Sequence, residues 1–204
     1  MSLRKESLKD KIVSILMQRI IDGELALGEK IREAHLAKEF GVSQSPVREA
    51  ITTLVVLGIL EHQPNVGTHV RVCNQEETIE IYEVREALEL FVASSAIDIN
   101  IAQLKEAYNG MLQSAKDNDI HSFVKYDQLL HAALVHASKN ELLIELWTQQ
   151  YTRSSVQTVI HEFKGNLHEI ALMHLPIVNA IESKNSKALK SALQMHYQQI
   201  IKTI

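Results

Sequence analysis

The scarcity of helix-breaking residues is the feature that most constrains the fold of this chain. Its 204 residues include only seven glycines and three prolines, and apolar residues recur over long stretches at the spacing of one helix face. Turns depend heavily on these two residue types, so a fold made of many short strands is disfavoured. With 46% hydrophobic residues the chain can also bury a core. We therefore predict a mainly α protein.

The first third of the chain shows three helical segments followed by two short strands. The helices are predicted over residues 8–21, over residues 32–40 and from Pro46 onward. Residues 25–31 are expected to form a turn, and residues 59–73 predict a small β-hairpin. Three helices and a hairpin, in this order, are typical of a winged helix-turn-helix.

The third helix has two unlike faces. Ser43 or Ser45 can cap its N-terminus, and Pro46 lies in the first turn, where a missing N–H group breaks no intrahelical hydrogen bond. At about 100° per residue, its apolar face comprises Val47, Ala50, Ile51 and Leu54. Its polar edge comprises Gln44, Ser45, Arg48 and Thr52.

That polar edge suits the major groove of DNA. In a helix-turn-helix the first-turn residues of the second helix meet base edges, and arginine can bond guanine while glutamine can bond adenine. Gly67 at the hairpin tip and His69 could contact the minor groove or the DNA backbone. From the residues alone, a small helical subdomain with a solvated polar edge is the alternative.

The chain after Cys73 predicts an all-α antiparallel helical bundle. Asn74 is a plausible helix cap, and later breaks delimit about six helices of roughly 15 to 24 residues joined by short loops. The breaks fall near Asn100, residues 117–119, 139–140 and 164–166, and residues 184–185. We therefore predict two domains, over residues 1–73 and 74–204.

Charge and cysteine content exclude few functions. The net charge is −4, with +1 in residues 1–72 (10 Lys/Arg, 9 Asp/Glu) and −5 in residues 73–204 (11 against 16), so a nucleic-acid partner is permitted but not required. Cys73, the single cysteine, excludes an internal disulfide. No apolar run reaches the roughly 18 residues of a membrane helix and no signal peptide is recognisable. We expect a cytoplasmic protein with no membrane partner.

Histidines are numerous, and one pair has the spacing of metal ligands. Asp127 and His131 lie at i and i+4, on one face of a predicted helix, and a carboxylate and an imidazole so placed can bind one divalent ion. His174 and His196 lie on the last two predicted helices. By spacing alone the pair could be an ordinary surface or hydrogen-bonded pair, and His136, His161 and His168 compete as ligands.

The N-terminal segment resembles the DNA-binding domain of the GntR family of bacterial transcription regulators. The matching elements are Gly23-Glu24-Leu25, Gly28, Leu36-Ala37, Gly41-Val42-Ser43, Pro46-Val47-Arg48-Glu49-Ala50, Leu54, Gly58 and Gly67. The helical remainder resembles the FCD ligand-binding domain of the FadR branch, in its six-helix, VanR-like form. This resemblance implies a homodimeric regulator, most often a repressor, that binds a near-palindromic operator in double-stranded DNA.

Three positions depart from the family pattern. The family usually has arginine at the positions of Gln44, Ala34 and Val66, whereas Arg48 is retained. With fewer cationic contacts, we predict an operator that differs from the family's usual one and a shallower salt dependence of DNA binding.

The resemblance also implies a metal site and an effector site. Many FCD domains bind a metal through an aspartate and three histidines at the positions of Asp127, His131, His174 and His196. We expect a divalent ion such as Zn²⁺ or Ni²⁺, and a small organic acid effector that binds the metal together with Arg85 and, as a second candidate, Arg153. Two alternatives stay open: a metal that only stiffens the bundle, and a metal-dependent enzyme, although no catalytic residue is recognisable.

Overall fold

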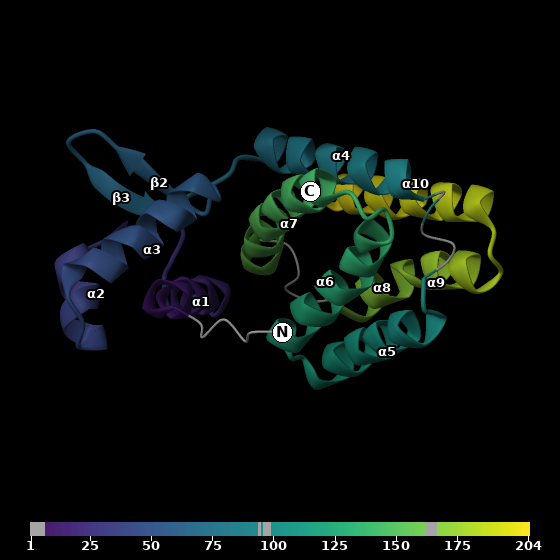
Figure 1. Ribbon diagram of the computed structural model, residues 1–204, viewed down its shortest axis with the longest axis horizontal. Coiled ribbons are helices and arrows are strands. Elements are labelled where there is room, and N and C mark those ends of the chain that lie inside the picture. The colour runs from purple at the N-terminus through teal and green to yellow at the C-terminus, as the bar shows by residue number, and fades with distance from the viewer. Residues whose placement is uncertain (1–6, 94, 96–98, 162–166) are drawn as a thin grey trace. The chain divides into compact units, whose positions relative to one another are not determined.

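The chain divides into two compact units at the bond between Cys73 and Asn74. The computed structural model describes residues 7–93, 95, 99–161 and 167–204, and for residues 153–161 and 203 it describes the backbone alone. The mainly α fold class is confirmed, since helices account for most of the described residues and one small sheet for the rest of the regular structure (Figure 1).

The first unit is a winged helix-turn-helix. Its helices are α1 (Leu8–Ile21), α2 (Glu33–Phe40) and α3 (Gln44–Val56), and its strands are β1 (Lys30–Ile31), β2 (Leu60–Gln63) and β3 (Gly67–Val70). The three strands form an antiparallel sheet in the order β1-β3-β2, and β2 and β3 are the wing (Figure 1).

Local chemistry sets the ends of these helices. Ser7 and Asp10 form a reciprocal capping box at the start of α1. Gly41 ends α2 in the left-handed conformation, with φ of 65°. Ser43 is the N-cap of α3 and Ser45 lies inside the helix, but the Ser43 side chain makes no capping hydrogen bond, so the predicted capping contact is not formed.

The sheet has one strand more than the sequence predicted. Lys30 and Ile31 pair with His69 and Thr68 of β3, where the sequence analysis expected only a turn. A strand of two residues is too short to show an alternating pattern. Ile31 is nevertheless buried, which gives β1 a place in the core of this unit.

The second unit is built of helices. They are α4 (Gln75–Val92), α5 (Ile101–Asp117), α6 (Ile120–His136), α7 (Glu141–His161), α8 (Leu167–Met173), α9 (Leu175–Glu182) and α10 (Ser186–Thr203). Helix α4 packs against α6, α7 and α10, and α5 packs against α6, α8 and α9. None of the helices in the described part of the chain is long and apolar enough to cross a membrane.

Asparagine and aspartate side chains begin most of these helices. Asn74, Asn100, Asp119 and Asn185 each accept a hydrogen bond from a backbone N–H of the following first turn. Asn118 ends α5 in the left-handed conformation, which asparagine tolerates better than most residues. The helix breaks predicted near residues 100, 117–119, 139–140 and 184–185 are therefore confirmed.

One predicted helix is divided in two. The sequence predicts a single helix over residues 167–183, but a break at His174 separates α8 from α9. Pro176 explains the break, because proline has no N–H to donate to the preceding turn and its ring crowds that turn. The break places His174 at the N-cap of α9.

Candidate functional site

The predicted DNA-contacting residues of α3 lie together on its exposed face. Gln44, Ser45, Arg48 and Thr52 are all exposed, whereas Val47, Ala50, Ile51 and Leu54 are buried, as the helical spacing predicts. Nε of Arg48 donates to Oε2 of Glu33 at 2.9 Å, but the Arg48 side chain stays 64% exposed. An exposed ion pair of this kind contributes little to stability, so the guanidinium can exchange Glu33 for another acceptor.

The wing places its two candidate residues differently. Gly67 begins β3 with φ of 113°, a conformation that favours glycine. His69 lies further along the strand, opposite Lys30 on one side and Glu61 on the other. Gly67 and His69 are both only partly exposed.

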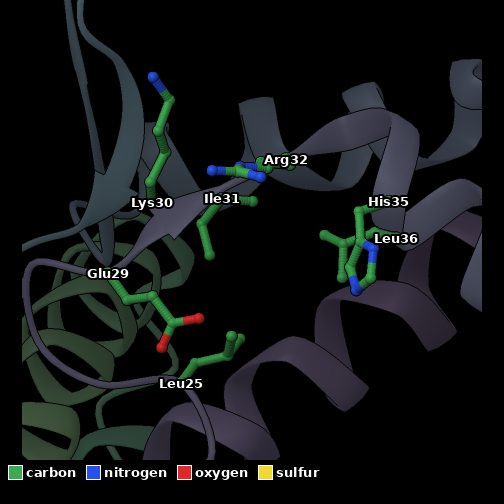
Figure 2. A pocket seen from close by; sticks show the side chains of 7 residues that line it. All are labelled: Leu25, Glu29, Lys30, Ile31, Arg32, His35 and Leu36. Carbon is green, nitrogen blue, oxygen red and sulfur yellow. The ribbon is translucent and has the colours of Figure 1, made fainter.

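A pocket of about 340 Å³ lies beside β1 and α2 of the same unit. Its lining residues are Leu25, Glu29, Lys30, Ile31, Arg32, His35 and Leu36. Figure 2 shows the acidic side chain of Glu29 on one side of this hollow and the imidazole of His35 on the other, with Lys30 directed away from it. The pocket belongs to the first unit and contains none of the residues predicted for the effector.

The four predicted metal ligands converge in the interior of the second unit. Asp127 and His131 come from α6, His174 from the break between α8 and α9, and His196 from α10. The three histidines are at most 1% exposed, and one ligand atom from each lies within 4.8 Å of the others. Oδ1 of Asp127 lies 3.0 Å from Nε2 of His174 and 3.9 Å from Nε2 of His131.

The hydrogen bonds of two histidines fix which nitrogen faces the centre. Nδ1 of His131 lies 2.6 Å from Oε2 of Glu89, and Nδ1 of His174 lies 2.9 Å from the carbonyl oxygen of Ile170. Both partners are acceptors, so in the neutral form of each imidazole the proton would lie on Nδ1 and a lone pair on Nε2. These two Nε2 atoms are 3.1 Å apart. With both imidazoles neutral, two lone pairs and a carboxylate oxygen would face one another at these distances, and either a proton on one Nε2 or a bound metal ion relieves the repulsion.

The remaining members of the cluster fit the same interpretation. His196 is 1% exposed, and its Nδ1 has no hydrogen-bond partner among the residues described. The Tyr151 hydroxyl donates to Oδ2 of Asp127 at 2.9 Å, which leaves Oδ1 to face the imidazoles. Three imidazoles and one carboxylate are a donor set that suits Zn²⁺ or Ni²⁺, so these residues could hold a divalent metal.

Glu89 of α4 is the buried carboxylate behind this cluster. Its Oε2 accepts from His131, and its Oε1 accepts from Nε1 of Trp147 at 2.7 Å and from the Tyr197 hydroxyl at 2.5 Å. Glu89 is fully buried, with Nη2 of Arg85 3.9 Å from Oε1. A carboxylate bonded to the far nitrogen of a ligand histidine is the usual support for metal-binding imidazoles.

Arg85 is buried beside this carboxylate. Only 4% of it is exposed, and its guanidinium carbon lies 4.7 Å from the ring centroid of Tyr151, with Tyr82 and Tyr197 at 5.4 and 5.5 Å. Tyr151 therefore contacts both Arg85 and the predicted ligand Asp127. The second predicted effector residue, Arg153, has its side chain outside the described part of the structure.

The electrostatics of the cluster favour the ionisation states that bind metal. Burial raises the pKa of Asp127, but the hydrogen bond with His174 and the attraction of His131, His174 and Arg85 outweigh it and hold the pKa far below its usual range. For Glu89, burial is likewise outweighed, by His131 and Arg85, and its pKa is lowered. Burial and the two neighbouring imidazoles lower the pKa of His196 well below its ordinary value. The site thus combines ionised carboxylates with a neutral imidazole.

Burial also distinguishes the predicted metal-binding histidines from the histidines that compete with them as ligands. His136 and His168 are exposed, and the side chain of His161 lies outside the described residues. Four further members of the buried cluster were not predicted from the sequence: Glu89, Trp147, Tyr151 and Tyr197. The i, i+4 spacing of Arg85 and Glu89 on α4 was a visible signal for a charge pair on one helix face.

A winged helix-turn-helix joined to a helical domain with a buried His/Asp cluster defines a DNA-binding transcription regulator. Residues 8–70 match the family described as bacterial regulatory proteins, gntR family, and residues 80–199 match the FCD domain. The chain belongs to the GntR family and carries an FCD domain, which confirms the resemblance proposed from the sequence.

Relatives with similar architecture are transcription regulators. The chain is 28% identical over 199 residues to a probable D-xylose utilization operon transcriptional repressor of Paenarthrobacter nicotinovorans, covering 95% of this chain and 87% of the relative. It is 26% identical over 208 residues to the gluconate operon transcriptional repressor of Bacillus subtilis, covering 97% and 85%. The alternative of a metal-dependent enzyme is therefore set aside.

Solved structures share the fold. Escherichia coli McbR/YncC superposes with a TM-score of 0.81 at 23% identity, covering 96% of this chain and 95% of that one. A GntR-type regulator from Rhodococcus sp. RHA1 gives a TM-score of 0.82 at 21% identity, covering 95% of both chains.

Proposed function

We propose that this protein is a cytoplasmic, homodimeric repressor whose binding to a near-palindromic operator is controlled by a metal-dependent organic acid effector. Residues 1–73 would bind DNA, and residues 74–204 would bind the effector and form the dimer. Asp127, His131, His174 and His196 would hold the metal, with Arg85, and Arg153 as a second candidate, on the effector.

The convergence of four ligand-type side chains from separate elements carries this proposal. The Nε2 atoms of His131 and His174 face one another across 3.1 Å, and Oδ1 of Asp127 lies 3.0 Å from the second of them. Burying such a set without a cation is costly, whereas a divalent ion would satisfy all of its members. When bound, the ion would supply positive charge for an anionic ligand.

Arg85 supports an effector that carries a carboxylate. Its buried guanidinium lies beside Tyr151, which also contacts Asp127. Tyr151 is therefore a common neighbour of the Arg85 guanidinium and of the predicted metal ligands. A guanidinium binds a carboxylate through two parallel hydrogen bonds. The gluconate operon repressor regulates genes named for an acid of this class, whereas the D-xylose relative is named for a neutral sugar.

Exposed apolar side chains on the second unit support a dimer. Val84 and Phe91 are 46% and 71% exposed at i, i+7 on α4, and Leu142 and Leu146 are 66% and 43% exposed at i, i+4 on α7. Side chains spaced in this way lie on one face of each helix, and exposed apolar faces favour association. Two copies of α3 would then meet two half-sites about one DNA turn apart.

Control by an effector requires that it bind two arrangements of the dimer with different affinity. The effector would stabilise an arrangement in which the two α3 helices no longer match the half-site spacing. Its binding to the protein and the protein's binding to DNA would then oppose one another, each weakening the other by the same factor.

A gel-shift titration with DNA upstream of the protein's own gene tests the proposal. We expect a specific complex that a scrambled duplex does not compete away, and release of that complex by an organic acid found in a thermal-shift screen. The screen is run with metal-loaded and with EDTA-treated protein. Specific DNA binding whose response to the acid is the same in both preparations would leave the metal with a structural role only.

A further inference from the structure

Lys30 connects β1 to the tip of the wing. In the sheet register it lies opposite His69, but its side chain extends toward the tip, where Nζ donates a hydrogen bond to the backbone carbonyl of Val66. Figure 2 shows the lysine directed along the neighbouring strands and away from the pocket. Lys30 is exposed, so its ammonium group reaches the tip and still faces solvent.

Gly67 leaves room for this position of Lys30. A Cβ atom on Gly67 would lie 3.1 Å from Cε of Lys30, a tight contact, and 3.4 Å from its Nζ, so the end of the lysine would have to shift by a few tenths of an ångström. The absence of a side chain at Gly67 therefore leaves the space in which the end of Lys30 lies. The side chain at the tip itself is apolar: Val66 is 47% exposed.

We propose that Lys30 supplies the phosphate-contacting cation of the wing, from β1 instead of from the tip. The bond to the Val66 carbonyl uses one of the three donors of the ammonium group, so two donors are left for a phosphate. That bond also holds the long side chain in one place, which lowers the entropy lost when it contacts DNA. Lys30 thus places a positive charge at the wing tip, where the exposed side chain of Val66 is uncharged.

The salt dependence of binding to non-specific duplex DNA tests this assignment, and it requires no knowledge of the operator. The Kd of the full-length protein for a 30-base-pair duplex of random sequence is measured by fluorescence anisotropy at a series of salt concentrations. Each phosphate contact contributes about 0.9 to the slope of log Kd against log salt. We expect Lys30→Met to reduce this slope by about that amount for each wing engaged, and Lys30→Arg to keep it.

Two controls make the result decisive. Lys116→Met removes one exposed lysine from the second unit and should leave the slope unchanged. Circular dichroism melting shows whether Lys30→Met is folded, and Lys30→Gln, which also removes the charge but keeps a polar side chain, replaces it if it is not. A Lys30→Met protein that binds more weakly with an unaltered slope would overturn the proposal, because Lys30 would then only support the wing. Wild-type protein that binds no duplex at low salt would contradict DNA binding altogether.

Discussion

Oε2 of Glu89 lies 2.6 Å from Nδ1 of His131, and both side chains are fully buried. This contact orients one imidazole of the cluster and favours a proton on its Nδ1. Oε1 of the same carboxylate accepts from Trp147 and Tyr197. Side chains on α6, α7 and α10 therefore hold Glu89 in place together. Glu89 therefore links α4, the helix of Arg85, to a predicted metal ligand on α6.

Replacing Glu89 by glutamine should weaken metal binding without removing a ligand. The amide has a similar shape, but it lacks the negative charge that makes the far nitrogen of His131 a better ligand. Loss of such a supporting group typically costs about 10- to 100-fold in metal affinity. Competition for Zn²⁺ with a chromophoric chelator measures this affinity directly.

The matched control is Glu83→Gln, which removes an exposed carboxylate from the same helix. It should bind Zn²⁺ as the wild type does. Equal affinities for Glu89→Gln and Glu83→Gln would show that the contact between Glu89 and His131 does not tune the site.

Removing the metal should lower the melting temperature of the second unit. A ligand present at about 100 times its Kd stabilises the folded state by about 2.7 kcal/mol, and chelation with EDTA removes that contribution. His196→Ala should abolish most of the difference between metal-loaded and chelated protein, because it removes one of the four predicted ligands.

His136→Ala on α6 is the corresponding control, since His136 is exposed. This variant should keep the full difference between the two preparations. Differential scanning calorimetry with and without EDTA reports both results, and a His196→Ala protein that still responds to the metal like the wild type would exclude His196 as a ligand.

Much of the fold was predictable because its signals are local. Asn74 and Asp119 begin helices by bonding to backbone groups three residues away, and the buried face of α3 follows from spacing alone. Strand β1 was missed because its two residues become a strand only through pairing with β3. The break at His174 had a visible cause in Pro176, which the sequence analysis did not use.

The metal cluster was predictable only in part. Asp127 and His131 share a helix, so their spacing reveals them, whereas His174 and His196 are far apart in sequence and were assigned by family resemblance. Glu89 was not predicted, because its role depends on the packing of α4 against α6 and α7, and no pattern within α4 specifies that packing. Lys30 likewise acquires its place at the wing only through the sheet.

Gly110 of α5 is predicted to be intolerant of any side chain. A Cβ atom there would lie 2.5 Å from the ring carbons Cδ1 and Cε1 of Tyr126 on α6. Alanine is favoured over glycine inside a helix by about 1 kcal/mol, but overpacking costs about 1–3 kcal/mol. Because the clash is with a ring and not with the end of a flexible chain, we expect the cost to exceed the gain, and Gly110→Ala to unfold at lower urea concentration.

The double variant Gly110→Ala/Tyr126→Ala separates the two effects. Compared with Tyr126→Ala alone, the added methyl group should now be neutral or stabilising, since the ring that it meets is gone. Urea unfolding followed by circular dichroism gives all the free energies of unfolding. A Gly110→Ala protein more stable than the wild type would mean that α5 and α6 can separate at little cost.

Arg48 is predicted to determine part of the sequence preference of α3. Its guanidinium is exposed and paired only with Glu33 among the contacts described, so it can form two hydrogen bonds to a guanine. A good bidentate pair provides about 1–3 kcal/mol of discrimination between bases. Arg48→Ala should therefore reduce the ratio of specific to non-specific affinity by about 5- to 150-fold, whereas Arg48→Lys should keep the charge and most of the non-specific affinity but lose the same discrimination. Anisotropy titrations of both variants with the operator and with a scrambled duplex measure this ratio, and an unchanged ratio in Arg48→Ala would assign the residue to the DNA backbone or to no contact.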